Sequence, residues 1–268
     1  MTHPWFAPRA PRVLAHRGLV TPAAAADGVA ENSFLAVAAA EAAGVAYVES
    51  DCHLTADGVV VLWHDADLHR ITGDARTVAD CTAAELEQLM ADRGGLVTLA
   101  QALDSFPALR FNLDVKADAA AEPTGRLVAR DADRVLLTSF SDGRRRAALA
   151  AARAHGGHPA TSGGTATVAR AVAAAASRSR GLLRRALRGV DALQVPERRG
   201  PVRIVTPHFV SACHRAGVEV HVWTVNQTPD MERLLDLGGH GLGVAGLGVD
   251  GLVSDRADVA LRVVRAAH

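Results

Sequence analysis

The stretch AYVESDCHL (46–54) holds the pattern from which the rest of the chain is interpreted. Its aromatic and β-branched residues predict a strand. Side chains alternate between the two faces of a strand, so Glu49 and Asp51 share one face with Tyr47. Two carboxylates at this spacing repel each other unless a cation lies between them, and hard divalent cations prefer such oxygen ligands. The stretch therefore predicts a metal site on a strand.

Strand-like and helix-like segments alternate on both sides of this stretch. Strands are expected at 12–18, 46–54, 59–65, 109–116, 134–140, 158–162, 192–196, 218–226 and 249–255. Helices are expected at 31–44, 82–90, 120–130, 142–154, 165–189, 207–217 and 229–237, with a closing helix after 255. This alternation predicts a parallel sheet, and the spacing favours an α/β fold of the (β/α)8 TIM barrel class. No linker interrupts it, so we expect a single domain over 1–268.

Polar residues cluster at the carboxyl ends of the expected strands. The catalytic groups of a (β/α)8 barrel lie at this end of the strands. These residues are His16, Arg17, Glu49, Asp51, His64, Asp65, Asp114, Lys116, Ser139, Trp223, Asn226 and Asp255. We therefore expect a site built from several strand ends.

The fourth expected strand repeats the carboxylate pattern. Asp114 can supply a third carboxylate, and Lys116, the chain's single lysine, then lies beside the metal site. An ammonium next to a metal ion is favourable if an anion such as a phosphate bridges the two cations. The alternative is a buried salt-bridge network of Glu49, Asp51, Lys116 and Arg17, which is disfavoured because buried carboxylates without a cation are costly.

Two histidines end the expected strands on either side of the acidic one. His16 follows the first strand and His64 the third, so both imidazoles are expected to face the acidic site. Two histidines around a metal-bound phosphodiester suit general acid–base chemistry near neutral pH.

The motifs occur in an order typical of one family. They are HRG (16–18), EN (31–32), ESD (49–51), TADG (55–58), WHD (63–65), NLDVK (112–116), SF (139–140), WTVN (223–226) and VDGLVSD (249–255). From residue 12 to about 258 the chain resembles the glycerophosphodiester phosphodiesterases. The resemblance implies a barrel enzyme that hydrolyses small-molecule glycerophosphodiesters to sn-glycerol 3-phosphate and an alcohol.

The resemblance also implies a role for each site residue. A divalent metal ion, Mg²⁺ or Ca²⁺, would be held by Glu49, Asp51 and Asp114, and the acid–base pair would be His16 and His64. Arg17 and Lys116 would hold the phosphate, and Trp223 would line the glycerol side. One departure is the third ligand, which is often Glu in this family and is Asp114 here.

Two other function classes remain as alternatives. A sphingomyelinase D-like or lysophospholipase D-like enzyme would use the same groups on a lipid headgroup. A non-catalytic barrel that binds a phosphate ligand would be expected to have lost one of the histidines or carboxylates. A nucleotide site in the glycine-rich stretch 238–251, which matches G-x-G-x-x-G twice, is disfavoured because a helix precedes it and a strand follows.

Composition excludes several partners and classes. The chain has 268 residues, 49% of them hydrophobic and 22% charged, which is ordinary for a globular protein and excludes intrinsic disorder. Lys+Arg and Asp+Glu are both 29, and this balance disfavours nucleic-acid binding. The arginine-rich stretch 178–188 is expected to be a solvated face, so membrane contact is not expected.

Cysteine usage and the chain's start suggest a compartment. The three cysteines, Cys52, Cys81 and Cys213, are too scattered for a disulfide framework and suggest a reducing environment. The first residues lack the pattern of a signal peptide. We therefore expect a cytoplasmic location, and nothing in the sequence indicates an oligomeric state.

Overall fold

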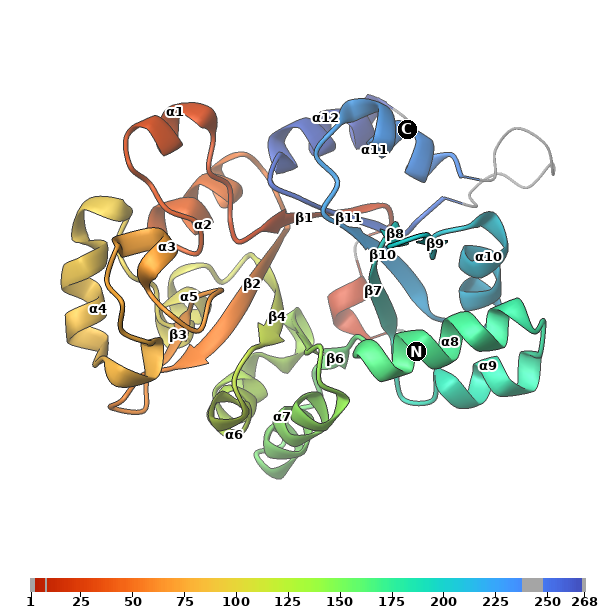
Figure 1. The fold of residues 1–268 in the computed structure, drawn as a ribbon, viewed down its shortest axis with the longest axis horizontal. Coiled ribbons are helices and arrows are strands. Elements are labelled where there is room, and N and C mark those ends of the chain that lie inside the picture. The colour runs from red at the N-terminus through yellow and green to blue at the C-terminus, as the bar shows by residue number, and fades with distance from the viewer. Residues whose placement is uncertain (1–2, 8, 238–247, 267–268) are drawn as a thin grey trace.

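Eight parallel strands form the barrel of the computed structural model, which describes residues 3–7, 9–237 and 248–266 (Figure 1). They pair in the order β6-β5-β4-β2-β1-β11-β10-β7, and an isolated parallel bridge between Ser162 and Ala192 brings the two ends of this sheet together. The strands are β1 (Arg12–His16), β2 (Tyr47–Leu54), β4 (Arg110–Val115), β5 (Val135–Thr138), β6 (Ala160–Thr161), β7 (Ala192–Pro196), β10 (Glu219–Trp223) and β11 (Gly251–Ser254). The predicted (β/α)8 class is confirmed.

Helices cover the outside of this barrel (Figure 1). They are α1 (Pro22–Ala26), α2 (Phe34–Ala42), α3 (His69–Thr72), α4 (Ala83–Met90), α5 (Leu99–Ser105), α6 (Ala121–Val128), α7 (Asp142–Ala154), α8 (Thr165–Ala176), α9 (Arg180–Ala186), α10 (Pro207–Arg215), α11 (Thr228–Leu235) and α12 (Ala257–Ala266). The single helix expected over 165–189 is wrong, because α8 and α9 are separate. Arg178 has a positive φ of 55°, and Ser179 caps the second helix by accepting a hydrogen bond from the Leu182 N–H.

The segment expected as the third barrel strand lies outside the barrel. It is β3 (Val60–Leu62), which pairs antiparallel with the outer end of β2. Only a few residues join the two strands, and such a short connection makes a hairpin, whereas a parallel pairing needs a crossover of a dozen residues or more. The long connection from β2 to β4 also carries α3, α4 and α5 and packs its own apolar cluster around Trp63, Leu86 and Met90.

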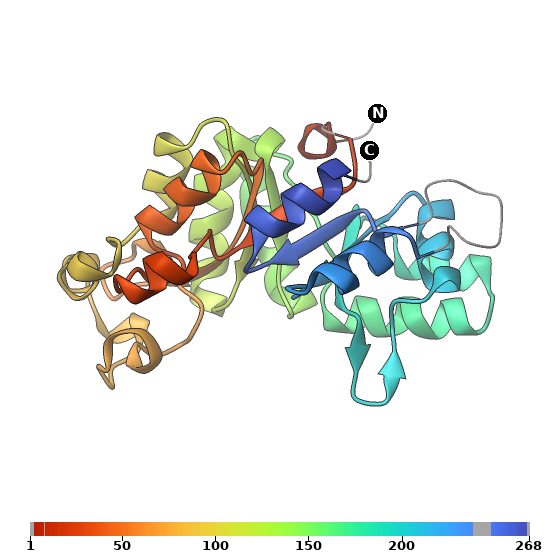
Figure 2. The ribbon, with the colours of Figure 1, turned by 90° about the horizontal axis from the view of Figure 1, so that it is seen from above.

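A second hairpin was not predicted. It consists of β8 (Arg198–Arg199) and β9 (Val202–Arg203), which pair antiparallel after β7. Figure 2 shows this hairpin projecting from the body of the molecule near α8.

An N-terminal tryptophan closes the amino-terminal end of the barrel. Trp5 is fully buried, donates a hydrogen bond from Nε1 to the Phe111 carbonyl at 3.1 Å, and accepts one at its own carbonyl from the Tyr47 hydroxyl at 3.0 Å. Its ring packs edge-on against that of Tyr47 and forms one cluster with interior residues such as Leu14 and Val253. We call Trp5 and its contacts the plug. It lies at the amino-terminal ends of the strands, whereas the site described below opens at their carboxyl ends.

Removing the plug is expected to destabilise the fold. Trp5→Ala should lower the free energy of unfolding by about 3–5 kcal/mol, the cost typical of a large cavity in a core. Urea unfolding followed by circular dichroism measures this value. Leu35→Ala is the control, because Leu35 is 52% exposed and its loss should cost under about 0.5 kcal/mol. Equal stability of the two variants would contradict a stabilising plug.

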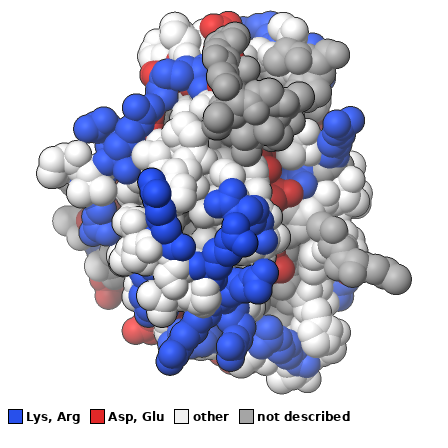
Figure 3. Space-filling model, turned by 90° about the vertical axis from the view of Figure 1, so that its right-hand side faces the viewer, with Lys and Arg blue, Asp and Glu red and all other residues white. Residues whose placement is uncertain are grey.

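Charge is unevenly distributed although the net charge is zero. No Asp or Glu occurs between Asp142 and Asp191, whereas arginines recur throughout that segment. Those of the stretch 178–188 are exposed, as predicted, and Figure 3 shows basic side chains gathered on the corresponding face. Within the part of the chain that the structure describes, no helix is long and apolar enough to cross a membrane.

Candidate active site

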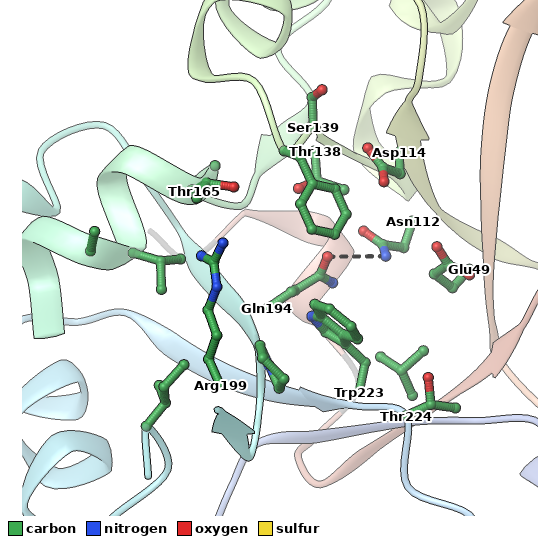
Figure 4. A pocket seen from close by; sticks show the side chains of 18 of the residues that line it. Glu49, Asn112, Asp114, Thr138, Ser139, Thr165, Gln194, Arg199, Trp223 and Thr224 are labelled. Carbon is green, nitrogen blue, oxygen red and sulfur yellow. Dashed lines mark hydrogen bonds between the residues drawn. The ribbon is translucent and has the colours of Figure 1, made fainter. Parts of the chain in front are cut away.

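The carboxyl ends of the barrel strands surround a cavity of about 890 Å³ (Figure 4). All of the predicted site residues line it: His16, Arg17, Glu49, Asp51, His64, Asp114, Lys116 and Trp223. Sequence reasoning therefore located the cavity. Its other lining residues come from further strand ends of the barrel, from α8 and from the β8–β9 hairpin. The glycine-rich stretch 238–251 cannot be compared in the same way, because residues 238–247 lie outside the described residues.

Three carboxylates approach one another across two neighbouring strands. Asp51 of β2 is paired in register with Asp114 of β4, and Glu49 lies two residues before Asp51 on the same face. The three side chains are buried, and the Lys116 Nζ lies 3.0 Å from Asp51 Oδ1 and 2.7 Å from Asp114 Oδ2. Burial and the charge of Asp51 raise the pKa of Glu49 to about 8. The ionised form of Glu49 is therefore disfavoured here in spite of the nearby ammonium.

These donors fit a hard divalent cation in type. Asp114 Oδ1 is buried and has no hydrogen-bond partner, and burial raises the pKa of this carboxyl. However, no three His, Cys, Asp or Glu side chains of residues 3–7, 9–237 and 248–266 are gathered closely enough to form a metal site. Because the Lys116 ammonium bridges Asp51 and Asp114, it would have to move for all three carboxylates to meet one ion. The metal therefore stays a prediction.

The HRG motif shapes the entry to this acidic cluster. Arg17 has a positive φ of 59°, and its Nε lies 3.4 Å from Asp51 Oδ2. Gly18 also has a positive φ, of 85°, and a Cβ there would lie 2.7 Å from the Ala36 carbonyl carbon. No side chain fits at Gly18, so the tight turn that aims Arg17 requires glycine.

The EN motif positions the acidic cluster, a role that the sequence analysis did not assign. Asn32 donates from Nδ2 to Asp51 Oδ2 at 3.1 Å and accepts from the Ser50 hydroxyl at 2.6 Å. Glu31 accepts a hydrogen bond at 2.7 Å from Arg17 Nη1. Asn32 therefore orients Asp51, and Glu31 orients Arg17.

A carboxylate holds the imidazole of His16. Its Nδ1 donates to Asp255 Oδ1 at 2.6 Å, and Asn226 Nδ2 donates to the other oxygen of Asp255 at 2.7 Å. Burial lowers the pKa of His16, but the hydrogen bond to Asp255 and the charge of Glu49 outweigh it, so the pKa is raised overall. The other ring nitrogen, Nε2, lies 3.9 Å from Glu49 Oε2 and faces the acidic cluster.

His64 is held in the same way by its sequence neighbour. Its Nδ1 donates to Asp65 Oδ1 at 2.7 Å, and Arg70 Nε donates to Asp65 Oδ2 at 2.6 Å. A carboxylate on Nδ1 sets the tautomer and leaves Nε2 for chemistry. The sequence predicts Asp65 and Asp255 at strand ends but does not identify them as histidine partners.

His64 lines the cavity, but the element that positions it differs from the prediction. It follows β3, so it does not end a barrel strand that flanks β2. The β2–β3 hairpin places His64 beside the carboxyl-terminal half of β2 instead, since the N–H of the preceding residue, Trp63, donates to the Asp51 carbonyl at 2.9 Å. The predicted position is correct, and the predicted strand arrangement is wrong.

Two aromatic rings and an amide border the other side of the acidic cluster. Trp223 and Phe140 meet edge to face with ring centroids 5.8 Å apart, and the Lys116 Nζ lies 5.3 Å from the Phe140 ring centroid. Gln194 accepts a hydrogen bond from Asn112 Nδ2 at 3.2 Å (Figure 4). Neither Phe140 nor Gln194 was predicted as a site residue.

Comparison with known proteins identifies the family. Residues 16–259 match the model of the "Glycerophosphoryl diester phosphodiesterase family". The chain belongs to this family. It is similar to a Mycobacterium tuberculosis protein named "Probable glycerophosphodiester phosphodiesterase 2", with 34% identity over 249 residues that span 92% of this chain and 88% of that protein.

Solved structures of the family share the fold. A glycerophosphodiester phosphodiesterase from Parabacteroides distasonis aligns with a TM-score of 0.69 and 24% identity over 97% of this chain and 99% of its own. A phosphodiesterase from Oleispira antarctica, solved in complex with the product sn-glycerol-3-phosphate, aligns with a TM-score of 0.69 and 21% identity over 96% of this chain and 97% of its own. The family match and the Mycobacterium tuberculosis relative make this chain a glycerophosphodiester phosphodiesterase rather than a non-catalytic barrel.

Proposed function

We propose that the enzyme, acting as one domain over 1–268, hydrolyses a glycerophosphodiester to sn-glycerol 3-phosphate and an alcohol. The observation that carries this is that three buried carboxylates and two histidines, each held by a carboxylate, line one cavity. A divalent cation, Mg²⁺ or Ca²⁺, held by Glu49, Asp51 and Asp114 would complete the site. The relative from Oleispira antarctica, which holds sn-glycerol-3-phosphate, supports the assigned product.

The cations of the chain would bind the phosphoryl group. Lys116 and Arg17 already contact Asp51 at the edge of the cavity, so a phosphoryl oxygen placed there meets both. When bound, the metal ion would supply Lewis-acid polarisation of the phosphoryl oxygens. Trp223, whose ring borders the cavity beside Phe140, would line the glycerol moiety.

The two histidines would move the protons. One takes the proton of the attacking hydroxyl, and the other gives a proton to the leaving alkoxide, so the site returns to its starting charge after hydrolysis. The attacking hydroxyl is the substrate's own glycerol 2-hydroxyl, which forms a cyclic phosphate that water then opens. Intramolecular attack is favoured because the hydroxyl is already positioned beside the phosphorus atom.

A substrate panel tests the reaction and its metal. Purified enzyme is assayed for released alcohol on glycerophosphodiesters and lysophospholipids, with and without EDTA. Activity is expected to vanish in EDTA and to return with Mg²⁺, Ca²⁺ or Mn²⁺, because three neighbouring carboxylates need a cation to bind an anionic substrate. Full activity in the presence of EDTA would contradict the requirement for a metal ion. If the enzyme hydrolyses none of the substrates in the panel, the proposed function is wrong.

Lys116→Arg is expected to be poorly tolerated although the charge is conserved. The Lys116 ammonium lies within 3.0 Å of two carboxylates, and a planar guanidinium cannot occupy this point-charge position without displacing them. We expect kcat/KM to fall by at least about 100-fold, the scale of one lost oxyanion donor. Arg126→Lys is the matched control, because Arg126 pairs with Glu122 on the surface. Near-normal kinetics of Lys116→Arg would leave Lys116 with only a structural role.

A further inference from the structure

Gln194 lies at the floor of the cavity and has no part in the proposed chemistry. It belongs to β7, lines the cavity and is half-buried. Its register partner on the neighbouring strand β10 is His221, and Trp223 follows His221 by two residues and so shares its face of the strand. Figure 4 shows the amide of Gln194 on the same side of Asn112 as Trp223, away from Glu49. Gln194 therefore lies on the side of the cavity where the glycerol moiety would bind.

A line of hydrogen bonds connects Gln194 to the amino-terminal end of the barrel. Gln194 Nε2 lies 3.3 Å from His221 Nδ1, and His221 Nε2 lies 3.0 Å from Glu219 Oε2. Glu219 is held in turn by Arg12, whose Nε and Nη2 donate to its two oxygens at 3.0 and 2.7 Å. At the other end, Gln194 Oε1 accepts from Asn112 Nδ2 at 3.2 Å. We call these five residues the floor network.

The proton positions in the floor network follow from Glu219, the one member that can only accept. Burial alone would raise the pKa of Glu219, but hydrogen bonds from His221 and Arg12 lower it overall, so the side chain is an ionised carboxylate. His221 Nε2 therefore carries a proton, and Nδ1 of the neutral ring accepts from Gln194 Nε2. This assignment fixes which end of the Gln194 amide is the oxygen.

Packing holds the His221 ring in place. The side chain is fully buried, and the ring of Trp5 lies against it with the centroids 5.8 Å apart. A Cβ at Gly251 would lie 2.8 Å from His221 Cδ2, which is closer than a side chain can come, so this position of the VDGLVSD motif requires glycine. The surrounding core therefore fixes the ring, and the ring fixes the amide of Gln194.

The oxygen of Gln194 can accept a second hydrogen bond. An amide oxygen has two lone pairs, and among the residues that the structure describes only Asn112 Nδ2 donates to Gln194 Oε1. The floor network thus offers an acceptor of fixed direction in a cavity that the rings of Trp223 and Phe140 also line. Glycerol hydroxyls are donors that a glycerophosphodiester carries, whereas its ionised phosphate can only accept.

We propose that Gln194 binds the 1-hydroxyl of the substrate's glycerol moiety and so selects substrates in which this hydroxyl is free. The proposal rests on the proposed function and adds a specificity-determining residue to that site. The 2-hydroxyl is not the partner of Gln194, because as the attacking group it must present its proton to a histidine. The 1-hydroxyl is then the remaining donor. A substrate without it leaves a buried acceptor unpaired and is bound less well.

A deoxy analogue tests the proposal. The substrates are the unacylated glycerophosphodiester with the highest kcat/KM in the panel, for example glycerophosphoethanolamine, and its 1-deoxy analogue, which keeps the attacking 2-hydroxyl. We expect kcat/KM of the wild type to be about 10- to 100-fold lower for the analogue, the scale of one buried polar group left unpaired. Equal values for the two substrates, or turnover of acylated substrates only, overturn this proposal and leave the proposed phosphodiester hydrolysis intact. Inactivity on the whole panel overturns both.

A variant of Gln194 connects this selection to its side chain. Gln194→Met keeps the approximate size of the side chain and removes the oxygen, so it should lower kcat/KM for the parent substrate and leave that for the 1-deoxy analogue nearly unchanged. The ratio of the two values should approach one. Gln88→Met is the matched control, because Gln88 is exposed on α4 and does not line the cavity. A wild-type ratio in Gln194→Met overturns the role of Gln194.

His221 is a positioning residue in this proposal, and two measurements test it. His221→Phe keeps a ring in the core and removes the acceptor of Gln194 Nε2, so the amide can turn either way and the ratio should fall by about threefold to tenfold. An unchanged ratio overturns the positioning role. Long-range ¹⁵N NMR of the wild type is expected to show His221 protonated at Nε2 alone. Protonation at Nδ1 would overturn the assignment of the Gln194 oxygen and the proposal with it.

Discussion

Replacing Glu49 by glutamine is expected to lower kcat/KM by at least about 10³-fold without weakening the fold, at the upper end of the loss for one electrostatic group of an active site. The substitution keeps the shape of the side chain and removes a carboxyl group that can ionise to bind a cation in the cavity. A hard cation loses an anionic ligand, so its binding weakens. The free energy of unfolding should stay the same or increase, because burial and the charge of Asp51 raise the pKa of Glu49 in the folded state, and glutamine has no proton to take up on folding.

Metal affinity gives a readout of Glu49 that does not depend on turnover. A ligand that binds only the folded state raises the melting temperature with its concentration. Mg²⁺ or Ca²⁺ should therefore raise the melting temperature of the wild type and have a smaller effect on Glu49→Gln or Asp51→Asn. Asp118→Asn is the control, since Asp118 is an exposed carboxylate that pairs with Arg144 outside the acidic cluster. Wild-type activity and an unchanged metal response in Glu49→Gln would contradict the ligand role.

The acidic cluster could be predicted because strand geometry acts over short distances in sequence. The alternation of a strand is enough to place Glu49 and Asp51 on one face, and Asp114 follows from the same rule on another strand. The histidine partners could not be found in this way. Asp255 lies 239 residues from His16. The two residues are neighbours only because the last strand pairs with the first, and no local spacing rule predicts this pairing.

The pairing of β3 and the composition of the cavity wall depend on tertiary contacts that leave no local pattern in the sequence. The periodicity of 59–65 indicates a strand, but only the short turn before it shows that β3 pairs antiparallel with β2. Part of the cavity wall consists of alanine and valine residues on α8, which by pattern alone are indistinguishable from core residues. The β8–β9 hairpin, which also lines the cavity, was not predicted from the sequence.

Replacing either His16 or His64 by alanine is expected to slow the reaction by about 10²–10⁴-fold, the usual contribution of one acid or base. The double variant should be little slower than the worse single variant, because both side chains serve one chemical step. His155→Ala is the matched control, since His155 is exposed at the end of α7 and does not line the cavity. Losses that multiply in the double variant would contradict a shared step.

A good leaving group distinguishes the two roles. The negative charge of Asp65 is offset by Arg70, whose Nε lies 2.6 Å away. Within the described part of the chain, the side chain of Asp255 accepts hydrogen bonds from His16 and from the neutral amide of Asn226, and no cation contacts it directly. An imidazolium is therefore better stabilised at His16, which favours His16 as the base and His64 as the acid. p-Nitrophenolate leaves without protonation, so a glycerophosphodiester of p-nitrophenol should rescue His64→Ala and not His16→Ala. Rescue of His16→Ala alone would exchange the roles. Failure to rescue either variant, with equally fast cleavage of a substrate lacking the 2-hydroxyl, would contradict both the acid role and the cyclic phosphate.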